Sequence, residues 1–438
     1  MLQSKTVRKY DTYKDSGIEW IGEIPQEWSL VRAKHLFYQS FEKGGNDLTL
    51  LSATQNEGVI PKDRLEGVVQ VKEDADLSVF KTVKIADFVI SLRSFQGGFE
   101  HSNFNGVITP AYTVFRNKKP INHNYFKMLF KSDGFIAKIN SLTTGIREGK
   151  NIQYDDFADM ILPWLDIEEQ QAIADYLDKK CGEIDKIVEA EKSVIEKLKE
   201  YKQSIITEAV TKGLDKSVPL KDSGIEWIGK IPQHWNRTKL KRLLSTPITD
   251  GPHETPELLD AGIPFLSAEA VKNNKLNFNL KRGYISLEEH IRFCKKCKPQ
   301  LNDIFMIKSG ATTGNVAIVE TEEEFSIWSP LALIRVDKNI LNYKYLFYYL
   351  QSYIFQKQVE LFWSYGTQQN IGMEVLGNLY VAYSNDLQEQ MKIAKYLDKK
   401  CFEIDTAIAD KEQLIEKFTE YKKSLIYECV TGKRKVVA

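Results

Sequence analysis

Apolar residues recur at alternating intervals of four and three along two long stretches of the chain. The first stretch runs from Glu168 to Gly213, and the second begins at Gln390. This heptad spacing keeps a narrow apolar seam on one side of an α-helix and is typical of coiled coils. Because no proline interrupts either stretch, we predict two long helices. The predicted seam residues are Leu177, Cys181, Ile184, Val188, Ile195, Leu198, Ile205 and Ala209 in the first, and Leu397, Cys401, Ile404, Ile408, Ile415, Phe418, Leu425 and Cys429 in the second.

The two stretches are copies of one sequence. The letters YLDKKC at 176–181 recur at 396–401, and EYK at 200–202 recurs at 420–422. A helix of this length spans roughly 60 Å at about 1.5 Å per residue, which is long for a core helix. We therefore predict that the copies pair antiparallel as an intramolecular coiled coil. A pair of ordinary amphipathic core helices is the alternative.

The repeat extends beyond the helices. The letters KDSGIEWIG at 14–22 recur at 221–229, and IPQ followed by a tryptophan recurs at 24–28 and 231–235. The chain is thus ordered as module, helix, module, helix, which indicates a duplicated domain pair rather than a solenoid. We expect the tryptophans of this repeated segment to pack against the long helices, because an identical stacking platform could not supply two specificities. They are Trp20, Trp28, Trp227 and Trp235.

Short β-rich runs and one longer helical stretch fill each module between these markers. Runs of this kind, bounded by Gly-bearing polar loops, are typical of strands. The predicted fold class is therefore α/β, with two α/β modules separated by two long antiparallel coiled-coil helices in a pseudo-two-fold internal repeat. Asp166 and Asp386 are expected to cap the long helices. The predicted runs are 82–92, 107–115, 160–163, 303–307, 316–319, 331–336 and 379–382, and the helical stretches are 125–140 and 342–361.

Composition narrows the class of protein. The 438 residues suffice for two or three domains, and 60 basic residues balance 60 acidic ones. Any nucleic-acid site must therefore be a local basic face. The N-terminal segment lacks the apolar stretch of a signal peptide, and no apolar run approaches the ~18 residues of a membrane span. Five scattered cysteines favour reduced thiols, so we expect a cytoplasmic protein without membrane contact.

Several motifs are informative when taken together. The openings WIGEIP and WIGKIP are each followed by tryptophan, and the long helices start with EEQQAIADYLD and QEQMKIAKYLD. The second module adds KSGATTGN at 308–315 and GTQQNI at 366–371. With the repeat order, these motifs resemble the specificity subunit of type I restriction–modification systems over nearly the whole chain. The first module departs from the two loop motifs, with SFQGG at 94–98 and GIREGKNI at 145–152.

The resemblance implies two target recognition domains, residues 1–165 and 213–385, each reading one half of a split double-stranded DNA site. It implies that the central helix, 166–212, serves as spacer and subunit dock and pairs with the C-terminal helix, 386–438. The expected partners are two methyltransferase subunits and, for cleavage, restriction (motor-nuclease) subunits. S-adenosylmethionine, ATP and Mg²⁺ would be bound by those partners. This chain would be a non-catalytic subunit that binds no cofactor or metal itself.

Candidate DNA contacts are polar residues on predicted loops, because Arg, Lys, Asn, Gln, Ser and Thr read base edges while Lys, Arg and hydroxyls hold phosphates. For each residue alone, a solvated loop position or a turn-forming role is the alternative. The candidates of the second module are Thr249, Asp250, His253, Thr255, Lys308, Ser309, Thr312, Thr313, Tyr365, Thr367, Gln368, Gln369 and Asn370. Those of the first are Ser52, Thr54, Gln55, Arg93, Ser94, Gln96, His101, Arg147, Lys150 and Asn151.

Other motifs give weaker support to nucleotide or metal binding. GIREGKN at 145–151 is one residue shorter than a phosphate-binding GxxxxGK[ST] loop, and we interpret it as a flexible basic loop facing DNA. CKKC at 294–297 lacks the second ligand pair of a structural zinc site, so its lysines favour a basic helix or loop, solvated or phosphate-facing. No HExxH or (D/N/S)PP(Y/F) motif occurs, which favours a binding subunit over an enzyme. A protein-binding scaffold without DNA readout is the alternative function.

Overall fold

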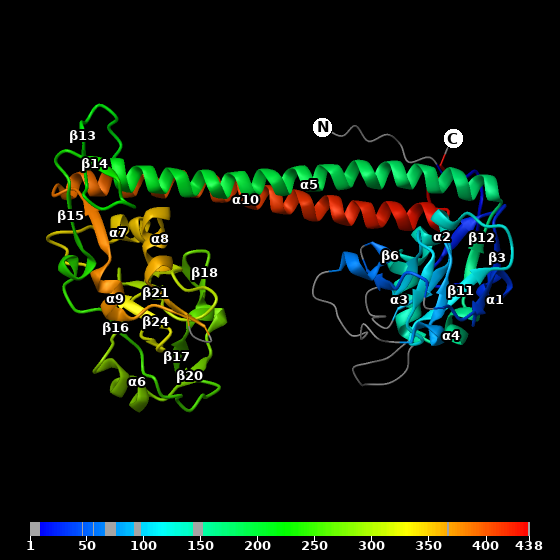
Figure 1. The fold of residues 1–438 in the computed structure, drawn as a ribbon, viewed down its shortest axis with the longest axis horizontal. Helices are drawn as coiled ribbons and strands as arrows, with labels where there is room; N and C mark the ends of the chain where they lie inside the picture. Colours follow the sequence, from blue (N-terminus) through cyan, green and yellow to red (C-terminus); the bar gives the residue numbers. More distant parts are fainter. Residues whose placement is uncertain are drawn as a thin grey trace. The chain divides into compact units, whose positions relative to one another are not determined.

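The computed structural model describes residues 9–45, 47–55, 57–65, 76–91, 98–142, 152–365 and 368–436 (Figure 1). Contacts divide the chain into two units. Unit 1 contains Met1–Glu191 and Gln413–Ala438, and unit 2 contains Lys192–Glu412. Each unit therefore combines one module with part of both long helices.

Both long helices begin at an aspartate cap. Helix α5 (Ile167–Lys212) starts where Asp166 Oδ1 accepts a hydrogen bond of 2.8 Å from the backbone N–H three residues ahead. Helix α10 (Leu387–Val430) starts where Asp386 Oδ1 accepts one of 2.8 Å from the N–H two residues ahead. These bonds satisfy donors that have no partner within the helix, which confirms the predicted caps.

In each unit the two long helices lie side by side and run antiparallel (Figure 1). In unit 1, Lys422 Nζ of α10 lies 2.6 Å from Asp185 Oδ1 of α5. In unit 2, Lys202 Nζ of α5 lies 2.7 Å from Asp405 Oδ2 of α10. The start of each helix thus faces the end of the other. All the predicted seam residues are buried or half-buried, so the predicted antiparallel pairing is confirmed.

Unit 1 is built on a four-stranded antiparallel sheet with the order β4-β11-β8-β9. Two-stranded pairs β1-β2, β3-β12, β5-β6 and β7-β10 surround it. Helices α2 and α3 contribute Phe130 and Phe135 to an aromatic core shared with Phe115 of the sheet. The bounds are β1 Tyr13–Asp15, β2 Glu23–Pro25, β3 Ser29–Arg32, α1 Ala33–Leu36, β4 Phe37–Ser40, β5 Leu51–Thr54, β6 Gly58–Pro61, η1 Lys62–Arg64, η2 Leu77–Val79, β7 Lys81–Val83, β8 Phe88–Ile90, β9 Phe99–His101, β10 Gly106–Ile108, β11 Thr113–Asn117, α2 His123–Phe130, α3 Asp133–Leu142, α4 Tyr154–Ala158 and β12 Ile161–Trp164.

Unit 2 repeats this plan with the sheet order β16-β24-β21-β22. It adds a three-stranded sheet, β20-β17-β23, in which β17 and β23 are parallel, and the pairs β13-β14, β15-β27, β18-β19 and β25-β26. The bounds are β13 Leu220–Asp222, β14 Lys230–Pro232, β15 Asn236–Lys239, η4 Leu240–Leu243, β16 Thr249–Asp250, β17 Ile263–Leu266, η5 Ala268–Ala270, β18 Val271–Lys272, β19 Lys275–Leu276, η6 Phe278–Leu280, β20 Gly283–Ile285, α6 Leu287–Cys294, β21 Ile304–Ile307, β22 Val316–Ile318, β23 Ser326–Ile327, β24 Leu331–Ile334, α7 Tyr343–Gln351, α8 Tyr353–Phe362, β25 Ser364–Tyr365, β26 Gln369–Asn370, α9 Met373–Asn378 and β27 Tyr380–Tyr383.

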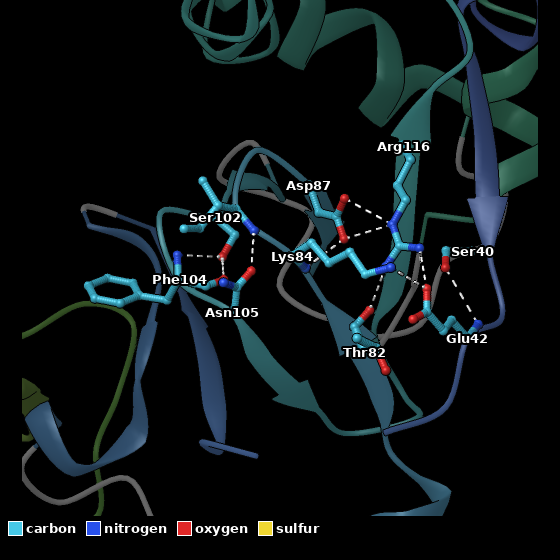
Figure 2. A network of polar contacts seen from close by, with 10 residues as sticks. Ser40, Glu42, Thr82, Lys84, Asp87, Ser102, Phe104, Asn105 and Arg116 are labelled. Carbon is cyan, nitrogen blue, oxygen red and sulfur yellow. Dashed lines mark hydrogen bonds and ion pairs between the residues drawn. The ribbon is translucent and has the colours of Figure 1, made fainter. Parts of the chain in front are cut away.

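An equivalent arginine–aspartate pair fastens both four-stranded sheets. Figure 2 shows Arg116 of β11 reaching Asp87, at 2.9 Å from Nε to Oδ2, and Glu42. In unit 2, Arg335 Nη2 lies 2.7 Å from Asp303 Oδ2. Each aspartate directly precedes a central strand and is nearly fully buried, where a carboxylate needs an ionic or hydrogen-bonded partner. The structural repeat therefore includes segments whose sequences have diverged.

The end of a long helix from the other half of the sequence completes the core of each module. In unit 1, the buried hydroxyl of Tyr125 donates to Val430 O at the end of α10, at 2.9 Å. In unit 2, the buried hydroxyl of Tyr345 lies 2.9 Å from Val210 O near the end of α5 and 2.8 Å from Ala382 O. The module of unit 1 thus depends on residues distant in the sequence, whereas the end of α5 directly precedes the module of unit 2.

Two of the repeated tryptophans anchor the starts of the long helices. Trp28 Nε1 donates to Glu169 Oε2 at 2.9 Å, and Trp235 Nε1 donates to Glu389 Oε1 at 3.2 Å. Both rings are buried in the module cores. The predicted packing of these two tryptophans against the long helices is confirmed.

The module interiors are more finely divided than the sequence predicts. The expected helical stretch 125–140 is broken into α2 and α3, and the stretch 342–361 into α7 and α8. At the second break, Ser352 Oγ donates to Tyr349 O at 2.6 Å and accepts from Phe355 N at 3.3 Å. One serine therefore ends a helix and caps the next.

We expect Tyr345→Phe to lower the free energy of unfolding by about 1–3 kcal/mol, because two buried carbonyl oxygens lose the hydroxyl that they share. Chemical denaturation measures this quantity. Tyr353→Phe removes the same atom from a side chain that is 60% exposed and should change stability by less than about 0.5 kcal/mol. Equal losses in the two variants would contradict the prediction.

Candidate nucleic-acid interface

Three polar segments of unit 2 that are distant in sequence lie together. The loop 308–315 joins β21 to β22 and exchanges two backbone hydrogen bonds with 368–371, of 3.0 and 2.8 Å. Lys308 Nζ lies 3.2 Å from Asp250 Oδ2, which ties this loop to the segment 249–255. We name these three segments the three-loop surface.

A buried carboxylate underlies the three-loop surface. Asp250 is fully buried, and its Oδ1 accepts a hydrogen bond from Lys296 Nζ. Lys308 Nζ and His253 Nε2 each lie 3.2 Å from Oδ2. Burial alone would raise the pKa of Asp250, but the hydrogen bonds and charges of Lys296 and Lys308 hold that pKa below its ordinary value. We call these four residues the Asp250 cluster.

The loop that follows Asp250 is held close to the neighbouring backbone. A Cβ atom on Gly251 would lie 1.9 Å from Ile327 O, so only glycine allows this approach. Ser329 N donates to Pro252 O at 3.2 Å, and Trp328 Nε1 donates to the next part of the loop at the same distance. The segment 249–255 therefore presents its side chains from a fixed backbone.

The candidate residues of the second module differ in exposure. Tyr365 lies on β25, and Thr367 is outside the described residues. The exposed candidates are His253, Thr255, Thr312, Gln368 and Asn370, and the half-buried ones are Thr249, Lys308, Ser309 and Gln369. The structure thus brings most of these candidates onto one surface, with polar side chains available to solvent.

Burial contradicts the direct DNA contacts predicted for Asp250 and Thr313. Asp250 has no exposed surface, and its carboxylate faces lysines. Thr313 is 9% exposed, and its hydroxyl donates to Gly310 O at 2.7 Å. Gly310 has a φ of 106°, a conformation that favours glycine. Thr313 is therefore a turn former that shapes the loop.

In unit 1, the hairpin of β5 and β6 carries three of the candidates. Ser52 is half-buried and Gln55 is exposed. Thr54 Oγ1 donates to Gly58 O at 2.9 Å and accepts from Glu57 N at 3.2 Å, so its hydroxyl stabilises the turn. The other candidates of this module, apart from His101, lie outside the described residues. They are Arg93, Ser94, Gln96, Arg147, Lys150 and Asn151.

His101 is a core residue, which contradicts its predicted contact with DNA. It lies on β9, and its ring centroid is 5.3 Å from that of Phe88 and 6.1 Å from that of His123. The side chain is buried, and burial lowers the pKa of His101 to about 4. A neutral ring in the core cannot reach a base or a phosphate.

Its neighbour Glu100 forms a buried ion pair beside the β5–β6 turn. Glu100 Oε1 lies 2.6 Å from Lys131 Nζ, which also donates to Gln55 O at 3.3 Å. Burial raises the pKa of Glu100 to about 7, and the Lys131 charge opposes this shift only in part. The β5–β6 turn is thus bonded through Lys131 to the carboxylate of Glu100, whose pKa is near neutral.

The contact between Lys296 and Asp250 has no local signal in the sequence. The sequence predicts only that Lys296 belongs to a basic segment, solvated or phosphate-facing. In the same segment, Cys297 is buried, with its pKa raised by burial to about 12, and Cys294 Sγ lies 3.5 Å from His290 Nε2. Within the described ranges, no three His, Cys, Asp or Glu side chains are grouped to hold a metal ion.

We expect Glu100→Gln to change the pH dependence of stability. The pKa of Glu100 is about 7 in the folded protein against an ordinary 4.5, so the folded state binds more protons between these values. Wild-type stability should therefore fall as pH rises from about 5 to about 7. The difference in the free energy of unfolding, variant minus wild type, should therefore rise by about 2–3 kcal/mol over that range.

Chemical denaturation at about pH 5 and about pH 8 tests this expectation. Glu57→Gln removes an exposed carboxyl on the adjacent turn and serves as the matched control, with a nearly constant difference from wild type. A constant difference for Glu100→Gln as well would refute the prediction.

Comparisons with known proteins agree with the resemblance in the sequence. A family model for the type I restriction modification DNA specificity domain matches residues 249–417. The EcoBI specificity subunit of Escherichia coli is 24% identical over 272 residues, 61% of this chain and 56% of that protein. The MjaVIII specificity subunit of Methanocaldococcus jannaschii is 24% identical over 426 residues, 94% of each chain. The matches with the two relatives thus span about half of one and nearly all of the other.

Solved structures show the same fold. A chain from a study of complex assembly and conformational transition in the type I R-M system has a TM-score of 0.69 at 14% identity, over 93% of this chain and 98% of that one. The HsdS subunit from Thermoanaerobacter tengcongensis gives a TM-score of 0.50 with the same identity and coverage. In the part of the chain that the structure describes, no helix is both long and apolar enough to span a bilayer. The chain therefore has the fold of the type I restriction–modification specificity subunits and carries their DNA specificity domain at residues 249–417.

Proposed function

We propose that this chain is the DNA sequence-specificity subunit of a type I restriction–modification complex and reads a bipartite double-stranded site, one half per module. The three-loop surface carries this proposal. It gathers hydroxyl, amide and ammonium groups from three sequence-distant segments of unit 2. Such groups recognise base edges in the major groove and hold phosphates.

The contrast between a repeated scaffold and diverged loops supports two different half-sites. The four-stranded sheets and their arginine–aspartate pairs are equivalent in the two units. The polar loops differ, because the first module has no counterpart of the sequence KSGATTGN. Equivalent folds with different polar groups suit two binding events of one kind on different sequences.

We further propose that the chain is non-catalytic and binds two methyltransferase subunits and, through them, restriction subunits. S-adenosylmethionine, ATP and Mg²⁺ then belong to those partners. The repeated helix sequences would offer each methyltransferase subunit an equivalent docking surface. Native mass spectrometry of the co-expressed subunits would measure the stoichiometry, with two methyltransferase copies expected per chain.

A mobility-shift measurement on random-sequence duplexes, with the methyltransferase subunits present, tests the proposed function. Sequencing of the retained duplexes should yield two short specified elements separated by an unspecified spacer. If the assembled complex retains no DNA while the subunits remain associated, the protein-binding scaffold is the better interpretation.

Exchange of residues 240–380 for the corresponding segment of a relative should change one half-site and leave the other unaltered. The reciprocal exchange of residues 30–160 is the matched control and should change only the other half. Methylome sequencing of cells that carry each exchanged chain measures both outcomes. A simultaneous change in both halves would rule out independent reading by the two modules.

We expect the double substitution Gln368→Ala and Gln369→Ala to relax specificity in the second half-site. Side-chain amides suit bidentate contact with adenine, so each lost base contact should cost about 1–3 kcal/mol of discrimination. Competition binding with singly mismatched duplexes measures the loss. Gln300→Ala, an exposed glutamine of the same unit outside the three-loop surface, should leave discrimination intact. An equal loss of affinity on every duplex would show that the pair does not read bases.

A further inference from the structure

The Asp250 cluster has hydrogen-bond capacity that the protein leaves open. The Lys296 ammonium carries three N–H donors. One donates to Asp250 Oδ1 and another to Gly251 O at 3.0 Å, while 48% of the side chain is exposed. His253 is more exposed, at 68%. Lys308 is only 12% exposed and lies against the same carboxylate. The accessible ammonium of Lys296 thus lies beside the same carboxylate as a largely buried ammonium.

The charges of the cluster favour an anion. Two ammonium groups share one carboxylate, which leaves the cluster with an excess of one positive charge. The nearby carboxylate of Glu254 lies 3.0 Å from Arg292 Nη2, which also lies 3.6 Å from Glu289 Oε1. A negatively charged ligand at Lys296 would therefore meet the excess positive charge of the cluster itself, strengthened by the low exposure of Lys308.

The position of the cluster identifies the class of anion. Lys308 belongs to both the cluster and the three-loop surface, so a ligand bound at Lys296 lies next to the side chains proposed to read bases. We propose that the Asp250 cluster binds a backbone phosphate of the DNA, with Lys296 as the direct donor and Asp250 as the positioning residue. This inference rests on the proposed function and adds a defined phosphate contact that fixes the three-loop surface on the duplex.

The geometry favours a phosphate over a base. An ammonium is a point charge without the planar fork that matches a base edge, and two of the three Lys296 donors are already used. The side chains also come from a rigid loop and from the segment after α6, which suits orientation of the protein on the duplex. A purely structural ion pair is the competing interpretation.

Lys296→Gln in the complete chain, assembled with methyltransferase subunits, tests the inference. Fluorescence anisotropy would give affinity against salt concentration for two duplexes, one with the selected site and one of random sequence. Loss of one phosphate contact should reduce the slope of log K against log salt by about 0.9. Affinity should fall by roughly tenfold on both duplexes alike.

Lys298→Gln is the matched control, because it removes the same charge two residues away. Lys298 Nζ pairs with Glu324 Oε1 at 3.1 Å and has no contact with Asp250 among the described residues. The control should leave the slope within experimental error of wild type. An equal effect of both variants would overturn the proposal in favour of general electrostatics. A loss confined to the selected site would overturn it in favour of a base contact.

The substitution Asp250→Asn distinguishes a positioning role of Asp250 from an effect of the net charge of the cluster. The substitution makes the cluster more positive, so a charge effect alone would tighten binding, whereas loss of the anchor for Lys296 should weaken binding on both duplexes. Circular dichroism and thermal unfolding would establish that each variant is folded. If Lys296→Gln and Asp250→Asn are folded and bind both duplexes as wild type does, this inference is refuted and the proposed function is not. A wild-type complex that binds neither duplex would refute the proposed function as well.

Discussion

The exchange of helix ends between the two halves of the sequence is the constraint on which the rest of the structure depends. Tyr125 needs a carbonyl from the end of α10, and Tyr345 needs one from near the end of α5. Apolar residues of the same helix ends belong to the same cores, such as Leu425 with the aromatic cluster of unit 1. The core of unit 1 combines two segments that are distant in the sequence, whereas the core of unit 2 lies within the contiguous segment Lys192–Glu412. The core of unit 1 thus cannot form fully until the last helix has been synthesised.

Both modules must keep the elements that pack against the helix ends, whereas their polar loops are under no such constraint and can differ. Buried charges of the scaffold are paired in the same way in both units, as with Asp87 and Asp303. Next to the loops, the two units have different buried ion pairs. Unit 2 gathers two lysines on Asp250, whereas unit 1 pairs Glu100 with a single lysine. A common fold can therefore carry different local electric fields at its loops without a change in its core.

The sequence predicts the elements that depend on local periodicity and capping. The heptad seams and the caps at Asp166 and Asp386 rest on spacing and hydrogen bonding within a few residues, and they match the structure. The sequence does not predict the breaks within the module helices. Ser352, for example, could be a polar residue tolerated inside a helix, and only the structure shows its hydroxyl bonded to Tyr349 O and Phe355 N. Some predicted β-rich runs also cover two separate short strands, because a three-residue strand shows too little alternation of apolar and polar residues to be told from its neighbour.

The candidate site was harder to predict because the role of a polar residue depends on burial, which loop composition does not reveal. Asp250 and His253 stand in the same polar run, yet one is fully buried and the other is exposed. His101 looks like a loop donor in the sequence, but β9 places it among aromatic rings. Lys296 acquires a role only through a contact across the fold. A buried carboxylate is most stable with cationic partners, so Asp250 fixes where lysines gather and thereby where the surface can receive an anion. The fully buried residue is thus the one that positions the exposed cationic side chain of Lys296.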